Sequence, residues 1–255
     1  MTFVKLICAI AITSLFSGCI VVAKPSHVNT HQRKTLTLDA SQLNGLDIRV
    51  GAGNLEVIGQ QDTTEIIVKV GIYSDSKHKN DYELSLDERG NSAELVAKMG
   101  NTSGFWIGDS PRIDVVVIVP QTLKITIDDG SGNINIADIH APVAVKDGSG
   151  DIMVKDINGD VNIDDGSGEI VIANINGNLN IYDGSGSITV KDISGSASFE
   201  DGSGDLTVRK VTGVVTVDDG SGDIDIEQAG GLTILETGSG GLKVSKVTGE
   251  FEIDS

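Results

Sequence analysis

The sequence predicts an all-β protein whose short strands stack in parallel as a β-solenoid with 18-residue coils. The first observation behind this fold class is a repeat. Asp-Gly-Ser-Gly recurs every 18 residues without a slip, and a seventh copy at Thr237 changes only its first residue. A fixed period of this length indicates one supersecondary unit repeated along the chain. The six complete copies begin at Asp129, Asp147, Asp165, Asp183, Asp201 and Asp219.

The second observation is that apolar and polar residues alternate inside each unit, which is typical of strands with one buried face. One apolar step spans three residues instead of two, and it predicts a bend near Lys155 and Asp156. Each unit therefore becomes two short strands with a corner between them, closed by the Asp-Gly-Ser-Gly turn. The same columns predict inward side chains at Thr233 and Leu235 in the sixth unit. In the second unit the apolar positions are Ile152, Val154, Ile157, Val161 and Ile163.

An antiparallel meander, with one hairpin in each unit, is the alternative architecture. Asn158-Gly159 is a good hairpin signal. A two-residue loop there would place Ile157 opposite Asp160, although the apolar residue is Val161, so only a three-residue loop with a bulge remains open. The apolar phase also continues through Gly159, which favours the solenoid and predicts a continuous strand with this glycine facing inward.

Residues 1–18 form the predicted signal peptide. One early charge is followed by an apolar run that ends at Leu15-Phe16-Ser17-Gly18-Cys19, too short for a spanning helix. This end resembles a bacterial lipobox, which implies that Cys19 carries the lipid and becomes the mature N-terminus. Phe16 departs from the lipobox pattern, and a plain signal peptide is the alternative. Cys8 leaves with the signal, so Cys19 would be the only mature cysteine.

Residues 19–34 are predicted to be the lipidated cysteine followed by a flexible tether. Residues 35–128 are predicted to form irregular early solenoid turns and an N-terminal cap, because seven strand-like segments there lack the strict repeat. Within this region Gly51-Ala52-Gly53 resembles a degenerate Gly-Ser-Gly turn, and a loop at 100–112 holds Phe105 and Trp106. Residues 129–255 are the seven-repeat solenoid.

The Gly-Ser-Gly-x-Ile-x-Val unit, the segment Ile113 to Val119 before Pro120, and the lipobox together identify a family resemblance. They resemble the bacterial putative-adhesin β-strand-repeat family of uncharacterised envelope proteins over residues 35–255. The resemblance implies a right-handed, single-stranded parallel β-helix related to adhesin heads. It brings no functional residues with it. Ile20 after the cysteine, by resemblance to enteric sorting, favours the outer membrane.

The net charge of the chain limits the kinds of partner that it can bind. The chain has a net charge of −18, and residues 129–255 hold 23 acidic and 7 basic residues, or −16. This sign excludes nucleic acid as a partner. The recurring Asp is explained by a hydrogen bond to its own turn, an Asx-turn. The alternative is calcium bridging between two acidic pairs, Asp164-Asp165 and Asp218-Asp219.

Catalytic signatures are weak, because the four histidines are scattered and the recurring serine belongs to the turn motif. The expected function is therefore that of a non-catalytic envelope lipoprotein. Its solenoid would be structural or binding, and it would contact the membrane through the lipid at Cys19. The alternative is a glycan-binding or glycan-cleaving β-helix, with Ca²⁺ as a candidate cofactor. Neither the sequence nor the resemblance names the surface ligand.

Overall fold

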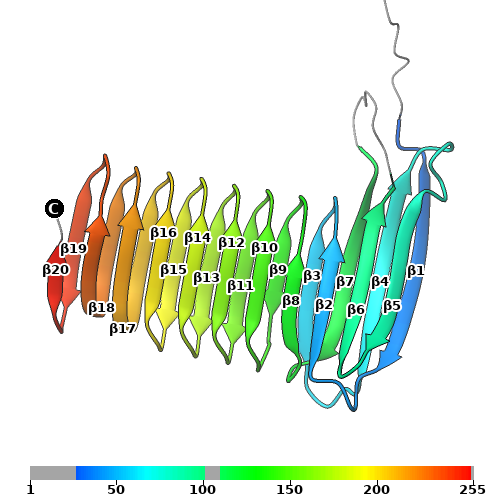
Figure 1. Ribbon diagram of the computed structural model, residues 1–255, viewed down its shortest axis with the longest axis horizontal. Coiled ribbons are helices and arrows are strands. Elements are labelled where there is room, and N and C mark those ends of the chain that lie inside the picture. The colour runs from blue at the N-terminus through cyan, green and yellow to red at the C-terminus, as the bar shows by residue number, and fades with distance from the viewer. Residues whose placement is uncertain (1–26, 101–109, 254–255) are drawn as a thin grey trace, which may run out of the picture.

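The structure, a computed structural model, describes residues 27–100 and 110–253. Its regular elements are all strands, and none of the described residues belongs to a helix that could cross a membrane. The strands form an elongated stack, closed by extra strands at the end where the chain begins (Figure 1). The strands are β1 (Thr30–Asp39), β2 (Gly45–Val50), β3 (Leu55–Gln60), β4 (Glu65–Ser74), β5 (Tyr82–Arg89), β6 (Ser92–Met99), β7 (Arg112–Pro120), β8 (Lys124–Asp128), β9 (Ile134–Ala137), β10 (Val143–Asp147), β11 (Ile152–Ile157), β12 (Val161–Asp165), β13 (Ile170–Ile175), β14 (Leu179–Asp183), β15 (Ile188–Ile193), β16 (Ala197–Asp201), β17 (Leu206–Asp219), β18 (Ile224–Glu236), β19 (Leu242–Val247) and β20 (Phe251–Ile253).

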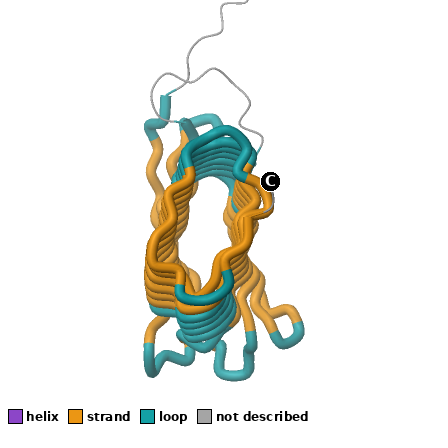
Figure 2. Tube along the Cα trace, turned by 90° about the vertical axis from the view of Figure 1, so that its left-hand side faces the viewer, coloured by secondary structure: helices purple, strands orange, loops and turns teal. Residues whose placement is uncertain are grey.

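Each coil of the repeat contributes one strand to each of two facing walls, and turns join the walls at both edges (Figure 2). From β8 to β17 each strand pairs in parallel with the strand 18 residues later, so Ile152 lies beside Ile170 and Thr189 beside Thr207. This register confirms the predicted parallel β-solenoid and rules out the hairpin meander. The interior is filled by the apolar columns, whose side chains are almost all fully buried through the first five units.

The predicted bend is present, but Gly159 does not lie in a continuous strand as predicted. Asp156 adopts a left-handed backbone conformation with φ of 58°, which Asp and Asn tolerate better than most residues. The chain then leaves strand geometry between Ile157 and Val161 and crosses to the other wall. A Cβ on Gly159 would lie 2.5 Å from the carbonyl carbon of Ala141 in the coil before it. The glycine is therefore needed for close stacking of the corners.

The sixth unit also differs from the prediction, because Leu232 and Ile234 are buried in place of Thr233 and Leu235. The ladder between β17 and β18 shifts at the corner and shifts back before the turn. A slip of one residue exchanges the two faces of a strand. Here the slip buries Leu232 and Ile234, and Leu235 becomes 47% exposed.

The N-terminal region is not stacked in sequence order. β2 and β3 form a coil that lies directly beside β8 and β9, with Leu55 paired to Ile134. On their other side β2 and β3 pair in parallel with β6 and β7. The chain from β4 to β7 thus lies on the side of β2 and β3 that faces away from the repeats, and the chain then crosses back to β8. Antiparallel strands β4, β1 and β5 complete this end. The predicted cap is therefore an insertion in the chain between two coils that lie side by side, β2–β3 and β8–β9.

The last coil is the least buried part of the stack. Its apolar residues continue the inward columns, yet Leu242, Phe251 and Ile253 are 37%, 53% and 45% exposed. They pack against the sixth unit on one side only, since β19 and β20 pair with β18 and with no later strand of the described chain.

Candidate functional site

A column of buried aspartates follows the interior along one edge of the solenoid. Each is the first residue of the Asp-Gly-Ser-Gly turn, two positions after the last apolar residue of its strand, so alternation directs its side chain inward. Neighbours in the column pair in register, Asp147 with Asp165 and Asp165 with Asp183. These six carboxylates, at most 6% exposed, are Asp129, Asp147, Asp165, Asp183, Asp201 and Asp219. We call them the aspartate ladder.

Each ladder carboxylate is held by its own turn. In Asp165, Oδ1 accepts a hydrogen bond from the backbone N–H of Ser167 at 3.3 Å, and Asp201 accepts one from Ser203 at 3.0 Å. The Asx-turn interpretation is thereby confirmed. The second oxygen, Oδ2, is buried in all six residues and makes no hydrogen bond to the described part of the chain.

Burial therefore dominates the ionisation of the ladder. The pKa of Asp129 and that of Asp201 are raised to about 7, mainly by removal from water and in addition by the charge of the neighbouring ladder residue. Burial likewise raises the pKa of Asp165 to about 6, with added repulsion from Asp147 and Asp183. Donation from the turn N–H groups opposes these shifts but does not cancel them. The ladder consequently holds protons at a pH where exposed carboxylates do not.

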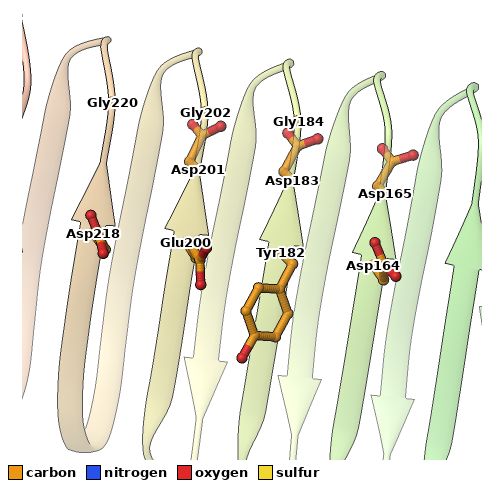
Figure 3. Close-up of a pocket in the computed structure, with 10 residues that line it drawn as sticks. All are labelled: Asp164, Asp165, Tyr182, Asp183, Gly184, Glu200, Asp201, Gly202, Asp218 and Gly220. Carbon is orange, nitrogen blue, oxygen red and sulfur yellow. The ribbon is translucent and has the colours of Figure 1, made fainter.

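A second row lies on the outside of the same wall, one residue before the ladder. Its members also pair in register from coil to coil: Asp164 with Tyr182, Tyr182 with Glu200, and Glu200 with Asp218. Together with the turn glycines and the ladder residues Asp165, Asp183 and Asp201 they line a hollow of about 460 Å³. Tyr182 is 55% exposed and stands between acidic groups on the two sides (Figure 3). We call this surface the acidic groove.

The predicted calcium pairs do not converge. Asp165 and Asp219 belong to the buried ladder, whereas Asp164 and Asp218 lie on the outer row. Successive residues of a strand face opposite sides, so the two carboxylates of one pair are directed apart. Across residues 27–100 and 110–253, no three His, Cys, Asp or Glu side chains are grouped to hold a metal ion.

Sequence reasoning placed the Asp column correctly in the turns but missed its burial. The signal was available, because Asp165 follows Val161 and Ile163 at a spacing of two. It also missed Tyr182, whose position in the outer row follows from the same alternation. Cys19, Phe105 and Trp106, which were also singled out, lie outside the described residues.

The Toastrack DUF4097 family profile matches residues 43–254, which is most of the chain and includes both the cap and the repeats. The chain belongs to the Toastrack DUF4097 family. The resemblance predicted from the repeated units is thereby confirmed. No curated protein matches this Toastrack chain.

Several solved structures are similar to the Toastrack fold described above. A putative lipid binding protein from Parabacteroides distasonis is 13% identical, with a TM-score of 0.49, over 91% of this chain and 100% of that one. A putative adhesin from Parabacteroides merdae is 12% identical, with a TM-score of 0.46, over 91% and 100%. A putative adhesin from Parabacteroides distasonis is 13% identical, with a TM-score of 0.44, over 90% and 100%. The chain is thus a β-solenoid of the Toastrack DUF4097 family.

Proposed function

We propose that this Toastrack protein is a non-catalytic lipoprotein of the cell envelope, anchored through Cys19 and binding its ligand along the outer walls of the solenoid. The observation that carries this proposal is the register of the repeats, which is unbroken on one wall from β8 through the second half of β17. Side chains on the outer wall recur at each coil, about 4.8 Å apart, and the acidic groove is built from such recurring positions. A surface of this kind suits a ligand that is extended or repetitive.

The constant register across the acidic groove also favours binding over catalysis there. A β-helix that cleaves polysaccharides typically carries acids with Arg or Lys at a local break in its repeat. Here the pairing between β12, β14, β16 and the second half of β17 keeps one register across the whole groove. The ladder carboxylates beneath it are bound to their own turns and buried, so they support the scaffold.

The anchor rests on the sequence at the N-terminus. The apolar run stops at Cys19, and no other cysteine follows it. Cys19→Ser should therefore release the protein from the membrane fraction into the soluble fraction, measured by fractionation and immunoblotting. Retention of the variant in the membrane after a high-salt wash, which screens electrostatic attachment, would refute the lipid anchor. Protease shaving of intact cells then shows which side of the outer membrane the solenoid faces.

Glycan binding is the second candidate, and the exposed ring of Tyr182 favours it. An aromatic face beside carboxylates offers stacking to a sugar ring and acceptors to its hydroxyl groups. A glycan array with and without Ca²⁺ tests this function and the calcium requirement together. Tyr182→Ala should abolish any binding, whereas Met153→Ala, an exposed apolar residue on the other wall, should preserve it. Equal loss in both variants would place the glycan elsewhere.

A further inference from the structure

A basic surface lies at the end of the molecule where the described chain begins. β1, β4 and β7 are adjacent strands of one wall (Figure 1). Their outward residues form rows across the three strands. One row is His31, Tyr73 and Arg112, the next is Arg33, Gly71 and Asp114, and the third is Thr35, Lys69 and Val116. We call the outer face made by these rows the basic face.

The first row is a fixed stack of rings and guanidinium. The His31 and Tyr73 rings lie parallel, with centroids 4.4 Å apart and an angle of 11° between their planes. The Arg112 guanidinium carbon lies 4.2 Å from the centroid of the Tyr73 ring, a cation–π distance. Tyr73 therefore holds two cationic or protonatable groups in place at the edge of the face.

Gly71 opens a hollow beside this stack. A Cβ at Gly71 would approach the Tyr73 ring to 3.2 Å and His31 Nε2 to 3.5 Å, so even a methyl group would reach the floor between the side chains. The hollow measures about 340 Å³, and Arg33 and Lys69 contribute to its lining. Its size falls within the range of small-ligand sites.

The charges around the hollow are unbalanced in favour of the cations. Asp114 is the acidic residue that lines it, and that carboxylate already pairs with Arg112 Nε at 3.4 Å and accepts the N–H of Asn54 at 3.1 Å. Arg33 and Lys69 have no ion-pair partner among the residues that the structure describes. Two cations left without acids, in a chain with a net charge of −18, indicate a site for an anion.

We propose that the basic face binds the phosphate groups of anionic phospholipids, so that the cap lies on the membrane and the solenoid stands away from it. Arg presents a planar fork and Lys a point charge to phosphate oxygens. Only 10 residues separate Cys19 from Thr30, where β1 begins, a reach of at most about 40 Å. The membrane surface is therefore within reach of this face, and the acidic repeats are repelled from it.

This inference rests in part on the proposed lipid anchor, which it complements. The lipid at Cys19 would hold the chain at the membrane, and the basic face would orient the cap on it, because each basic residue near an anionic surface adds to the attraction. The two proposals fail separately, because the basic face can be tested in a full-length Cys19→Ser protein that carries no lipid.

The experiment is co-sedimentation of that protein with two kinds of vesicle at fixed ionic strength. One is made of phosphatidylcholine alone and the other contains phosphatidylglycerol in addition. The apolar segment at residues 1–18 contributes to both, so the difference between them measures the preference for anionic headgroups. Arg33→Gln with Lys69→Gln should reduce this preference about 30-fold, from the attraction of two basic residues. Lys124→Gln with Lys155→Gln, an equal change of charge at exposed positions elsewhere, should leave it within about twofold.

Circular dichroism and thermal unfolding establish that all variants remain folded. No preference for phosphatidylglycerol, or equal losses in the two double variants, would overturn the proposal. A third arm adds glycerol phosphate at millimolar concentration with salt held constant. Failure to displace the protein supports a membrane surface as the ligand. Full displacement would mean that the site serves a soluble phosphate ester, and would overturn the membrane assignment.

Discussion

Neutralising one member of the aspartate ladder should make the protein less sensitive to alkaline conditions. The perturbation is Asp165→Asn, which keeps Oδ1 as acceptor for the Ser167 N–H and removes the buried charge at Oδ2. Asp165 is 3% exposed and lies in register with Asp147 and Asp183. The amide introduced by the substitution lies between the unpartnered carboxylate oxygens of these two neighbours, which can accept its hydrogens.

The magnitude follows from the pKa of Asp165, which burial raises from 3.8 to about 6. The folded state keeps this proton to a higher pH than the unfolded state, so the free energy of unfolding falls as the pH rises from about 4 through about 6. A shift of about 2 units corresponds to roughly 3 kcal/mol, fully lost by about pH 8. Asp165→Asn should therefore stabilise the protein by about 2 kcal/mol at pH 8 and have little benefit at pH 4.

The assay is urea unfolding followed by circular dichroism at pH 4, 5, 6, 7 and 8 with constant ionic strength. Glu200→Gln is the matched control, since it removes a charge from the exposed outer row of the same wall. It should leave the slope of stability against pH nearly unchanged. A wild-type protein that gains stability between pH 5 and 8 would refute the reasoning, as would the same response from both variants.

Three further predictions test the solenoid itself. Ile170→Ala, at a fully buried position, should lower the free energy of unfolding by about 2 to 5 kcal/mol, whereas Glu169→Ala beside it should be near neutral in the same denaturation curves. Thr189→Cys with Thr207→Cys, on paired positions of adjacent coils, should form a disulfide under mild oxidant because their Cα atoms lie about 4.8 Å apart; persistence of both thiols by mass spectrometry would contradict the parallel register. Gly159→Ala, whose Cβ would lie 2.6 Å from the carbonyl oxygen of the corner before it, should cost about 1 to 3 kcal/mol by thermal unfolding, and a neutral result would show that the corners can separate.

The fold of the repeats was predictable because every unit carries the same sequence pattern. Apolar alternation, a turn motif and a fixed period agree from one unit to the next, so the sequence alone predicts that Ile152 pairs with Ile170. The slip at Leu232 could not be foreseen, since the 18-residue count is unchanged. The corner of the sixth unit is one residue shorter than the corner it pairs with, and one extra residue at Leu235 restores the count before the turn. The register therefore depends only on whether Leu232 or Thr233 is buried.

The N-terminal order was beyond sequence reasoning for a different reason. Strand propensity located the early strands, but the pairing of Leu55 with Ile134 depends on contacts between distant segments. At the candidate site, the Asp-Gly-Ser-Gly motif located the turns, and alternation could have shown that Asp165 faces inward. Alternation could not predict that Oδ2 lacks a hydrogen-bond partner, because this depends on how tightly the neighbouring coils pack around the oxygen.

The register that the first five units share makes the length of the stack independent of its cross-section. Each added unit meets the same surface that its predecessor met, so it lengthens the stack by about 4.8 Å and leaves the existing interior unchanged. Duplication or deletion of a whole unit in the gene is therefore a structurally mild event, while gain or loss of one residue exchanges inside for outside. Selection can in this way set the distance between the cap and the last coil, in steps of one repeat, without redesigning the core.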